Sequence, residues 1–505
     1  MAGQARRWWA LALIALAQFM VIMDTSIIGV ALPQMQADLG FSQAGLSWVF
    51  NAYVVAFGGL LLLGGRLSDL LGARRVFTAG WAILLVGSVA SALADSTWLE
   101  LAGRAVQGVG AALIAPAALT LLMVLFGSTP RELTKALALY GAAAPAGGTA
   151  GVFLGGVITQ WLSWPFVFWL YVPIAAAVLV MTPVLLPATD TARGRLDVLG
   201  ALMVTAGLGL GVFAVVRAPE VGWSAGSTVG ALAAAVVLLM AFWWTQAHGS
   251  APLMRLGIFR APDLGAANLA QLLLGGAWIP MWFFLNLYLQ QVLGYRAFAS
   301  GAALLPMTIA IMVLMVAIVP RLVTRTGPKP LIVTGLLVLA GALAWMSFAR
   351  PGGAFTVDVL GPSLLAAVGM SLAFIPSLGT ALSAARPEEG GLASGIVNTS
   401  YQVGSALGLA AMTAVAAAYG ATEVQDPNAL TSGFSAAFLG AAAIAAAGGL
   451  LAALTVRRPT PVAADVATTA GETNGATDRA TSASGGAAQA DYGNGSPARG
   501  DADAA

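Results

Sequence analysis

Hydrophobic runs long enough to cross a lipid bilayer recur along almost the whole of this 505-residue chain. A bilayer core about 30 Å thick is spanned by roughly 20 apolar residues in a helix. Only 9% of the residues are charged, whereas about a quarter are charged in an ordinary soluble domain. So few charges cannot cover the surface of soluble domains, and the sequence therefore predicts an all-α integral membrane protein and excludes a soluble enzyme. About fourteen runs meet the length requirement, at approximately 9–32, 46–65, 76–94, 98–125, 135–158, 164–186, 197–216, 228–247, 264–291, 299–319, 330–349, 357–381, 391–419 and 433–455.

Several kinds of chemistry lack the residues that they need. The chain has no cysteine and a single histidine, His248. Disulfides, thiol nucleophiles, cysteine-bound zinc, histidine metal sites and Ser-His-Asp catalysis are therefore excluded. No Walker loop is found, so an ion gradient rather than ATP must supply energy for any transport. We expect no cofactor and no metal, and a net charge of +2 is too small to indicate nucleic acid as a partner.

The loop charges predict the orientation, because cytoplasmic loops of membrane proteins collect Lys and Arg. If the N-terminus lies inside and fourteen helices alternate, most basic loop residues fall on the inner side. The outer loops would then hold Arg217, Arg296 and Arg350, with acids that include Glu100 and Asp358. Both termini are predicted to be cytoplasmic. The last segment, 459–505, is rich in Ala, Gly, Thr, Ser and Asp, and we expect a disordered tail there.

Two inner loops resemble each other. The loop Gly65–Arg75 follows the second run, and the loop Pro320–Lys329 follows the tenth. Their matching positions are Leu67 and Leu322, Gly72 and Gly327, and Arg74 and Lys329. A duplicated six-helix unit with an inserted helix pair explains this, and two repeats around a midplane site are typical of alternating-access transporters. The predicted domains are an N-terminal bundle 1–186, a linker 187–258 with two extra helices, a C-terminal bundle 259–458 and the tail 459–505.

Four motifs resemble those of one transporter family. The loop with Gly65, Asp69, Gly72, Arg74 and Arg75 resembles the loop signature of the major facilitator superfamily. Leu101–Ala112 is similar to its fourth-helix pattern, and Met23–Pro33 resembles the first-helix signature of its fourteen-helix drug:proton antiporters, with Gly29 in place of the usual Asn. The resemblance implies the major facilitator fold, with two six-helix bundles plus two extra central helices. The fifth run resembles the antiporter motif, with Val152 in place of proline, at Gly147, Gly151, Gly155 and Gly156.

Asp24 is the one carboxylate expected well inside a span, about fifteen residues into its helix. A charge there costs at least ~2.5 kcal/mol, so the side chain must face the bundle interior and be paired or protonated. Arg104 is its natural partner, with Gln107 one turn further along. We interpret this group as the proton-coupling site. The alternative is a permanent ion pair that only fixes helix packing.

Two further roles are implied by the resemblance. Asp69 would hold an inner gate shut by facing the N-terminus of the helix that begins near Gly390-Gly391, with an ordinary solvated loop charge as the alternative. The glycines at 147–156 would form a hinge, or else serve static packing.

Aromatic, methionine and amide side chains in several spans are candidates for a substrate cavity, because such surfaces suit varied apolar ligands. The second half lacks a membrane carboxylate, which argues against dicationic substrates. The candidates are Asn51, Tyr53, Trp278, Met281, Trp282, Asn286, Gln290, Met307, Asn398, Tyr401 and Gln402.

The sequence thus predicts a monomeric, proton-coupled exporter of small amphiphilic drugs or antibiotics in a bacterial inner membrane. Its partners would be the substrate, protons and the lipid bilayer. One alternative is a dedicated exporter of an endogenous lipid, siderophore or self-made antibiotic. A membrane enzyme or a channel is a second alternative, but no acid–base pair or metal-ligand set supports an enzyme.

Overall fold

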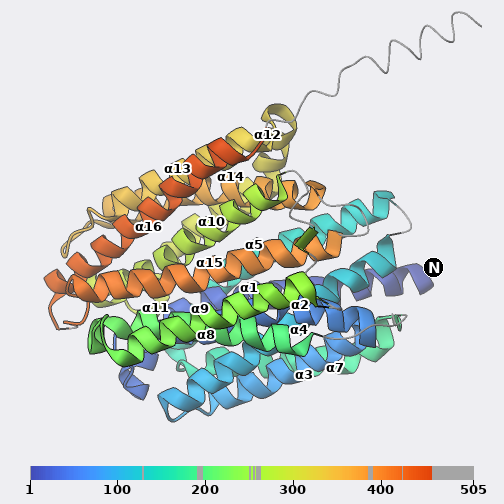
Figure 1. The fold of residues 1–505 in the computed structure, drawn as a ribbon, viewed down its shortest axis with the longest axis horizontal. Helices are drawn as coiled ribbons and strands as arrows, with labels where there is room; N and C mark the ends of the chain where they lie inside the picture. Colours follow the sequence, from blue (N-terminus) through green and yellow to red (C-terminus); the bar gives the residue numbers. More distant parts are fainter. Residues whose placement is uncertain are drawn as a thin grey trace, which may run out of the picture. The chain divides into compact units, whose positions relative to one another are not determined.

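The computed structural model describes residues 2–127, 130–189, 197–249, 252–253, 256–257, 263–384, 390–423 and 425–457. All regular elements in these ranges are helices (Figure 1). Fourteen helical segments of the described chain are long and apolar enough to cross a membrane, which confirms the predicted all-α fold. The predicted tail, 459–505, lies outside the described residues.

The first six spans are formed by α1 to α7. Short α6 runs almost directly into α7, so the two helices form one span. Pro116 and Pro145 lie inside α4 and α5 without ending them, as neighbouring helices in a membrane permit. The bounds are α1 Ala2–Leu39, α2 Trp48–Leu71, α3 Ala73–Ala92, α4 Thr97–Phe126, α5 Pro130–Trp161, α6 Pro165–Trp169 and α7 Tyr171–Leu185.

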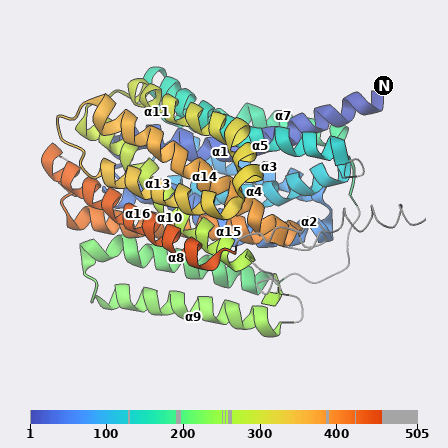
Figure 2. The ribbon, with the colours of Figure 1, turned by 90° about the horizontal axis from the view of Figure 1, so that it is seen from above.

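The remaining spans comprise a central pair and a second set of six. The central pair is α8 (Val198–Val221) and α9 (Gly226–His248). Figure 2 shows α9 at the edge of the bundle with α8 beside it, and α8 packs on α2, where a Cβ on Gly59 would lie 3.0 Å from Thr205 Cα. The second set consists of α10 Leu264–Leu287, α11 Ala297–Val313, α12 Val319–Thr326, α13 Pro328–Met346, α14 Gly361–Ala384, α15 Gly390–Ala418 and α16 Pro427–Thr455. Three π-helical turns extend these helices: Tyr288–Val292 follows α10, Leu314–Ile318 joins α11 to α12, and Phe355–Leu360 leads into α14.

The two similar loops have similar backbones. Gly72 joins α2 to α3 with φ 89°, and Gly327 joins α12 to α13 with φ 77°. Glycine adopts such positive φ values readily because it has no Cβ. The matched glycines of the sequence repeat therefore make equivalent tight turns.

Glycines let the long helices of each half approach closely. In the first half a Cβ on Gly151 of α5 would lie 2.7 Å from the Met23 carbonyl oxygen of α1. In the second half a Cβ on Gly408 of α15 would lie 2.5 Å from Gly276 Cα of α10. Small residues permit this backbone contact in membrane helices. The pair α1–α5 thus has its counterpart in the pair α10–α15.

Contacts between the halves also use glycines. A Cβ on Gly301 of α11 would lie 2.6 Å from the Val152 carbonyl oxygen of α5, and one on Gly156 would lie 3.0 Å from Phe298 Cα. On the other side, a Cβ on Gly58 of α2 would lie 2.7 Å from Gln402 Cβ of α15. The halves therefore meet along α5–α11 and α2–α15.

Two acids that were predicted in outer loops lie in helical elements instead. Glu100 lies in the first turn of α4 with 0% exposure, and Asp358 lies in the π-helical turn before α14 with 6% exposure. Both acids lie within the predicted spans 98–125 and 357–381, and only the charge count assigned them to the outer loops. That assignment was wrong because an acid near the end of a span was counted with the adjoining loop although its side chain is buried.

The close contact at Gly151 predicts a large effect of a side chain there. We expect Gly151→Val to lower stability by about 1–3 kcal/mol because the side chain would force α5 away from α1. Gly141→Val is the matched control on the same helix, since a Cβ there meets nothing within 4 Å. Thermal unfolding of the purified proteins in detergent measures both, and equal losses for the two variants would contradict the close packing.

Candidate functional site

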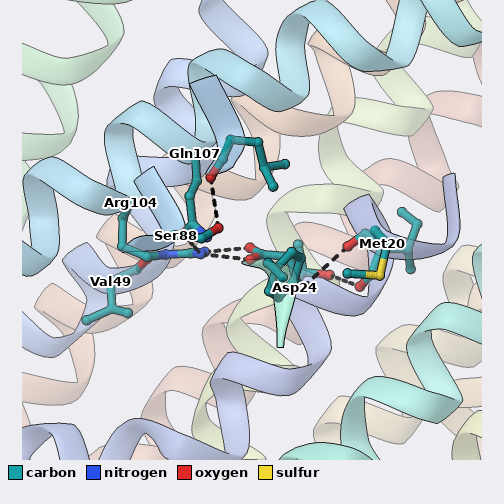
Figure 3. A network of polar contacts seen from close by, with 10 residues as sticks. Met20, Asp24, Val49, Ser88, Arg104 and Gln107 are labelled. Atoms are coloured by element: carbon teal, nitrogen blue, oxygen red, sulfur yellow. Dashed lines mark hydrogen bonds and ion pairs between the residues drawn. The ribbon is translucent and has the colours of Figure 1, made fainter. Parts of the chain in front are cut away.

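A buried ion pair joins α1 to α4 in the first half (Figure 3). Arg104 of α4 donates from Nη1 to Asp24 Oδ1 at 2.9 Å and from Nη2 to Oδ2 at 2.7 Å. The arginine is 0% exposed and the aspartate 3% exposed. Two parallel bonds between a planar guanidinium and a carboxylate are the strongest form of this contact. The structure therefore contains the predicted ion pair between Asp24 and Arg104.

The other donors of Arg104 are also engaged. Its Nε donates to the Val49 carbonyl oxygen of α2 at 2.9 Å, and Nη1 donates to Gln107 Oε1 at 2.7 Å. Gln107 Nε2 in turn donates to Ser88 Oγ of α3 at 2.8 Å. Figure 3 shows the guanidinium pointing at Asp24, with Val49 on one side and Gln107 bonded to Ser88 on the other. The network holds Arg104 in a single orientation.

Aromatic rings complete the surroundings of the guanidinium. The Arg104 Cζ lies 4.7 Å from the centre of the Tyr53 ring and 5.8 Å from that of Phe168. Cations are attracted to such ring faces, most strongly where water is excluded. Side chains from α1, α2, α3, α4 and α6 therefore build one closed polar site in an apolar bundle.

The pair links the charges of α1 and α4 directly. Arginine is charged under all ordinary conditions, so a buried guanidinium needs a counter-charge, and both oxygens of Asp24 supply it here.

The predicted gating loop lies at the opposite end of α2 from Val49. Gly72 makes the turn described above, and Gly65 packs over Pro116, with 3.8 Å between a Cβ placed on it and Pro116 Cβ. Arg74 donates from Nη1 to the Leu186 carbonyl oxygen at 3.3 Å, whereas Asp69 and Arg75 are exposed. The approach of Asp69 to the N-terminus of α15 stays a prediction.

Part of the predicted cavity set gathers where α10 meets α1. A Cβ on Gly29 would lie 2.9 Å from Asn286 Nδ2 and 3.1 Å from Trp282 Nε1. Trp282 also stacks on Trp278, with ring centres 6.4 Å apart. The family's usual Asn at position 29 would require the side chains of Asn286 and Trp282 to shift.

The other predicted cavity residues are dispersed. Gln290 donates to the Val30 carbonyl oxygen at 3.0 Å, and Gln402 packs on Gly58 in the α2–α15 contact. Tyr401 packs edge-on against Phe374 with ring centres 5.7 Å apart, and Asn398 is exposed. The remaining members are buried, namely Asn51, Tyr53, Met281 and Met307.

Sequence reasoning missed several members of the ion-pair site. Ser88, Phe168 and the Val49 carbonyl contact it from other helices, and no spacing in the sequence relates them to Arg104. Tyr53 was predicted as a cavity residue, but its ring faces the guanidinium. Glu100 could have been found, since it precedes Arg104 by one helical turn.

A second ion pair lies at the far end of the other half. Arg350 Nη2 lies 2.9 Å from Asp358 Oδ2, which also accepts from the Ala354 backbone N–H at 2.8 Å. The hydrogen bond to Asp358 raises the pKa of the exposed Arg350 guanidinium. This pair ties a loop to the start of a span. In the described part of the chain, no group of three His, Asp or Glu side chains could hold a metal ion.

The buried pair predicts a strong energetic coupling. We expect Arg104→Gln to lower stability by about 3–5 kcal/mol, because Asp24 would be left buried without its counter-charge. The double variant with Asp24→Asn is expected to lose less than the sum of the single changes. Thermal unfolding of the parent, the two single variants and the double variant measures this coupling energy.

Arg7→Gln is the matched control, because it removes an ion pair that is only partly buried. Arg7 contacts Glu132 at 3.0 Å with both side chains part-exposed, so we expect a loss of about 1 kcal/mol or less. Strict additivity at Asp24 and Arg104 would argue against the coupling.

Comparisons with known proteins agree with this fold. The chain is 40% identical over 437 residues to the cephamycin export protein CmcT of Amycolatopsis lactamdurans, which covers 86% of this chain and 89% of the relative. It is 36% identical to the puromycin resistance protein pur8 of Streptomyces alboniger, covering 85% and 86%. It is 32% identical to the tetracenomycin C resistance and export protein of Streptomyces glaucescens, covering 81% and 76%.

Solved structures share the fold at low identity. A peptide transporter of the POT family matches with a TM-score of 0.64 and 18% identity, covering 91% of this chain and 98% of that one. The nucleoside transporter NupG matches with a TM-score of 0.63 and 13% identity, covering 89% and 99%. The Major Facilitator Superfamily model matches residues 14–409. The chain therefore belongs to the major facilitator superfamily, and it is a multi-pass membrane transporter of small molecules rather than an enzyme.

Proposed function

We propose that the protein exports small amphiphilic drugs or antibiotics across a bacterial inner membrane in exchange for protons. The observation that carries this proposal is the buried Asp24–Arg104 pair, a titratable group closed inside the bundle of a transporter. The names of the relatives support the substrate class, since they are named for cephamycin export, puromycin resistance and tetracenomycin C export.

The coupling follows from the linkage between charge and geometry at the pair. A proton that reaches Asp24 releases Arg104, and an ionised Asp24 recaptures it. Each state holds the surrounding helices α2, α3 and α4 differently, because Val49, Ser88 and Gln107 all bond within the same network. A substrate that binds one state more tightly therefore changes proton affinity, and the converse also holds.

Substrate recognition is proposed for the contact between α10 and α1. In the described part of the chain, Trp282 Nε1 and Asn286 Oδ1 are buried without a hydrogen-bond partner, as are both amide atoms of Asn51 and the Tyr53 hydroxyl. Buried polar atoms normally have partners, so a polar ligand group in this region would gain them. Gly29 lies five residues after Asp24, or about 7.5 Å along α1. A ligand there would act close to the titrating carboxylate.

Alternating access is proposed between the bundles 1–186 and 259–458, with the segment 187–258 as an accessory pair. The glycine contacts of α5 with α11 and of α2 with α15 are the surfaces on which the bundles would rock. We place both termini in the cytoplasm and treat the protein as a monomer without nucleic-acid partners. The loop with Asp69 would then close the inner side.

A second candidate is a dedicated exporter of one self-made antibiotic. The relatives named for export of cephamycin or tetracenomycin C favour it. A panel of chemically diverse compounds, tested in cells that lack other efflux systems, separates the two functions. Export of many classes indicates a broad drug exporter, and export of one class a dedicated one.

Removing the titrating group is expected to uncouple transport. In everted vesicles with an imposed pH gradient, we expect Asp24→Asn to lose gradient-driven puromycin or ethidium transport, because an amide cannot exchange a proton. Glu132→Gln serves as the control, since its part-exposed carboxylate contacts only Arg7 among the described ion pairs. If Asp24→Asn transported as well as the parent and kept its pH dependence, proton coupling at Asp24 would be excluded.

The gating loop generates a separate expectation. We expect Asp69→Ala to reduce transport several-fold without reducing the amount of protein in the membrane, because an exposed side chain contributes little to folding. Asp95→Ala is the matched control, an exposed acid outside the predicted gate. Transport rates normalised to membrane protein measure the effect, and unchanged turnover would remove Asp69 from the gate.

A further inference from the structure

Glu100 is a second carboxylate inside the first bundle. It is 0% exposed in the first turn of α4, and neither of its side-chain oxygens has a hydrogen-bond partner in the described part of the chain. Nothing in the packing of a lipid-embedded bundle calls for such a group, because burying an unpaired carboxyl is costly. A buried acid without a structural partner is therefore a candidate for a functional role.

Its position links it to the ion pair. Glu100 precedes Arg104 by four residues on α4, so their side chains are neighbours on the helix surface. Gly103 packs against Ser91 of α3 on the adjoining face, and Ser91 Oγ is also buried without a partner. Ser88, one turn from Ser91, accepts from Gln107, which accepts from Arg104. A row of polar groups thus runs from Glu100 along the α3–α4 contact to the guanidinium.

The charge balance decides the state of Glu100. Other titratable groups that surround the pair are Tyr53 of α2, whose ring faces Arg104, and Tyr171 of α7, whose hydroxyl donates to the Met20 carbonyl oxygen at 3.4 Å. The α3 face offers only the hydroxyls of Ser88 and Ser91. One arginine therefore serves two buried carboxyls. Arg104 is bonded to both oxygens of Asp24, so no counter-charge is left for Glu100. Glu100 must therefore hold a proton in this conformation.

We propose that Glu100 is a second proton-binding group, and that Arg104 alternates between Asp24 and Glu100. In one state Asp24 is ionised and paired with Arg104 while Glu100 is protonated. In the other state Asp24 is protonated and the guanidinium pairs with ionised Glu100. The exchange shifts one proton from Glu100 to Asp24 and leaves the total charge of the three groups unchanged.

The exchange also gives protons a route. Glu100 lies toward the end of α4 opposite Phe126, and Phe126 lies beside Arg7 near the start of α1. Glu100 is therefore closer than Asp24 to the end of the bundle away from the N-terminus. This inference rests on the proposed proton coupling, and it adds the group through which protons from that end would reach Asp24.

Infrared spectroscopy of the purified protein tests the shared arginine directly. Neutral carboxylic acids have a carbonyl stretch that is separate from those of carboxylates and amides. The parent protein is expected to show such a band at neutral pH, and carbon-13 labelling of glutamate is expected to shift it. We expect Asp24→Asn to lose the band, because Arg104 then pairs with Glu100 and ionises it.

Two variants complete the test. Glu100→Gln is expected to lose the band as well, while Asp95→Asn, an exposed acid shortly before α4, is expected to retain it. A band that persists in Asp24→Asn, or that glutamate labelling does not shift, would overturn the proposal. The comparison of parent with Asp24→Asn needs no substitution at Glu100, so it holds even where Glu100→Gln fails to fold.

Transport distinguishes this inference from the proposed function. Two coupled carboxyls titrate in two macroscopic steps, so we expect Glu100→Gln to lose one of two steps in the pH profile of gradient-driven ethidium transport. A parental profile in Glu100→Gln together with uncoupled Asp24→Asn would overturn only the role of Glu100. Gradient-driven transport that persists in Asp24→Asn would overturn the proposed coupling itself.

Discussion

The architecture of the first bundle depends on keeping one arginine and one aspartate together out of water. Neither charge could lie in hydrocarbon alone, and the pair is stabilised by the further partners of the guanidinium. Val49, Gln107 and the ring of Tyr53 supply those partners from α2 and α4. Because these groups come from different helices, the proposed change in the charge of Asp24 would act on several helices at once.

Glycine contacts join the long helices within each half and between the halves. Within each half, α1–α5 and α10–α15 are in backbone contact at Gly151 and Gly408. Between the halves, Gly301 of α11 lies against the backbone of α5, whereas Gly58 of α2 lies against the side chain of Gln402. In the proposed rocking motion the contacts between the halves are the ones that would slide.

The sequence predicted the features that arise from the cost of placing single groups in lipid. The fourteen spans and the pairing of Asp24 with Arg104 both depend on such local requirements. It did not predict Ser88 or Phe168 at the pair, because their approach depends on how helices are rotated against one another. Glu100 was misplaced for a different reason, since a charge near a span end looks the same in sequence whether it faces water or the bundle.

The two halves divide the proposed work unequally, although their helix pairs α1–α5 and α10–α15 correspond. The buried ion pair belongs to the first half, whereas the counterpart helix α10 carries Trp282 and Asn286 against Gly29 of α1. The second half's own ion pair, Arg350 with Asp358, lies at a loop where the arginine is exposed. In the proposed mechanism, a ligand that enters between α10 and α1 would contact the helix that carries Asp24. Recognition by the second half would thus change proton affinity in the first half through α1.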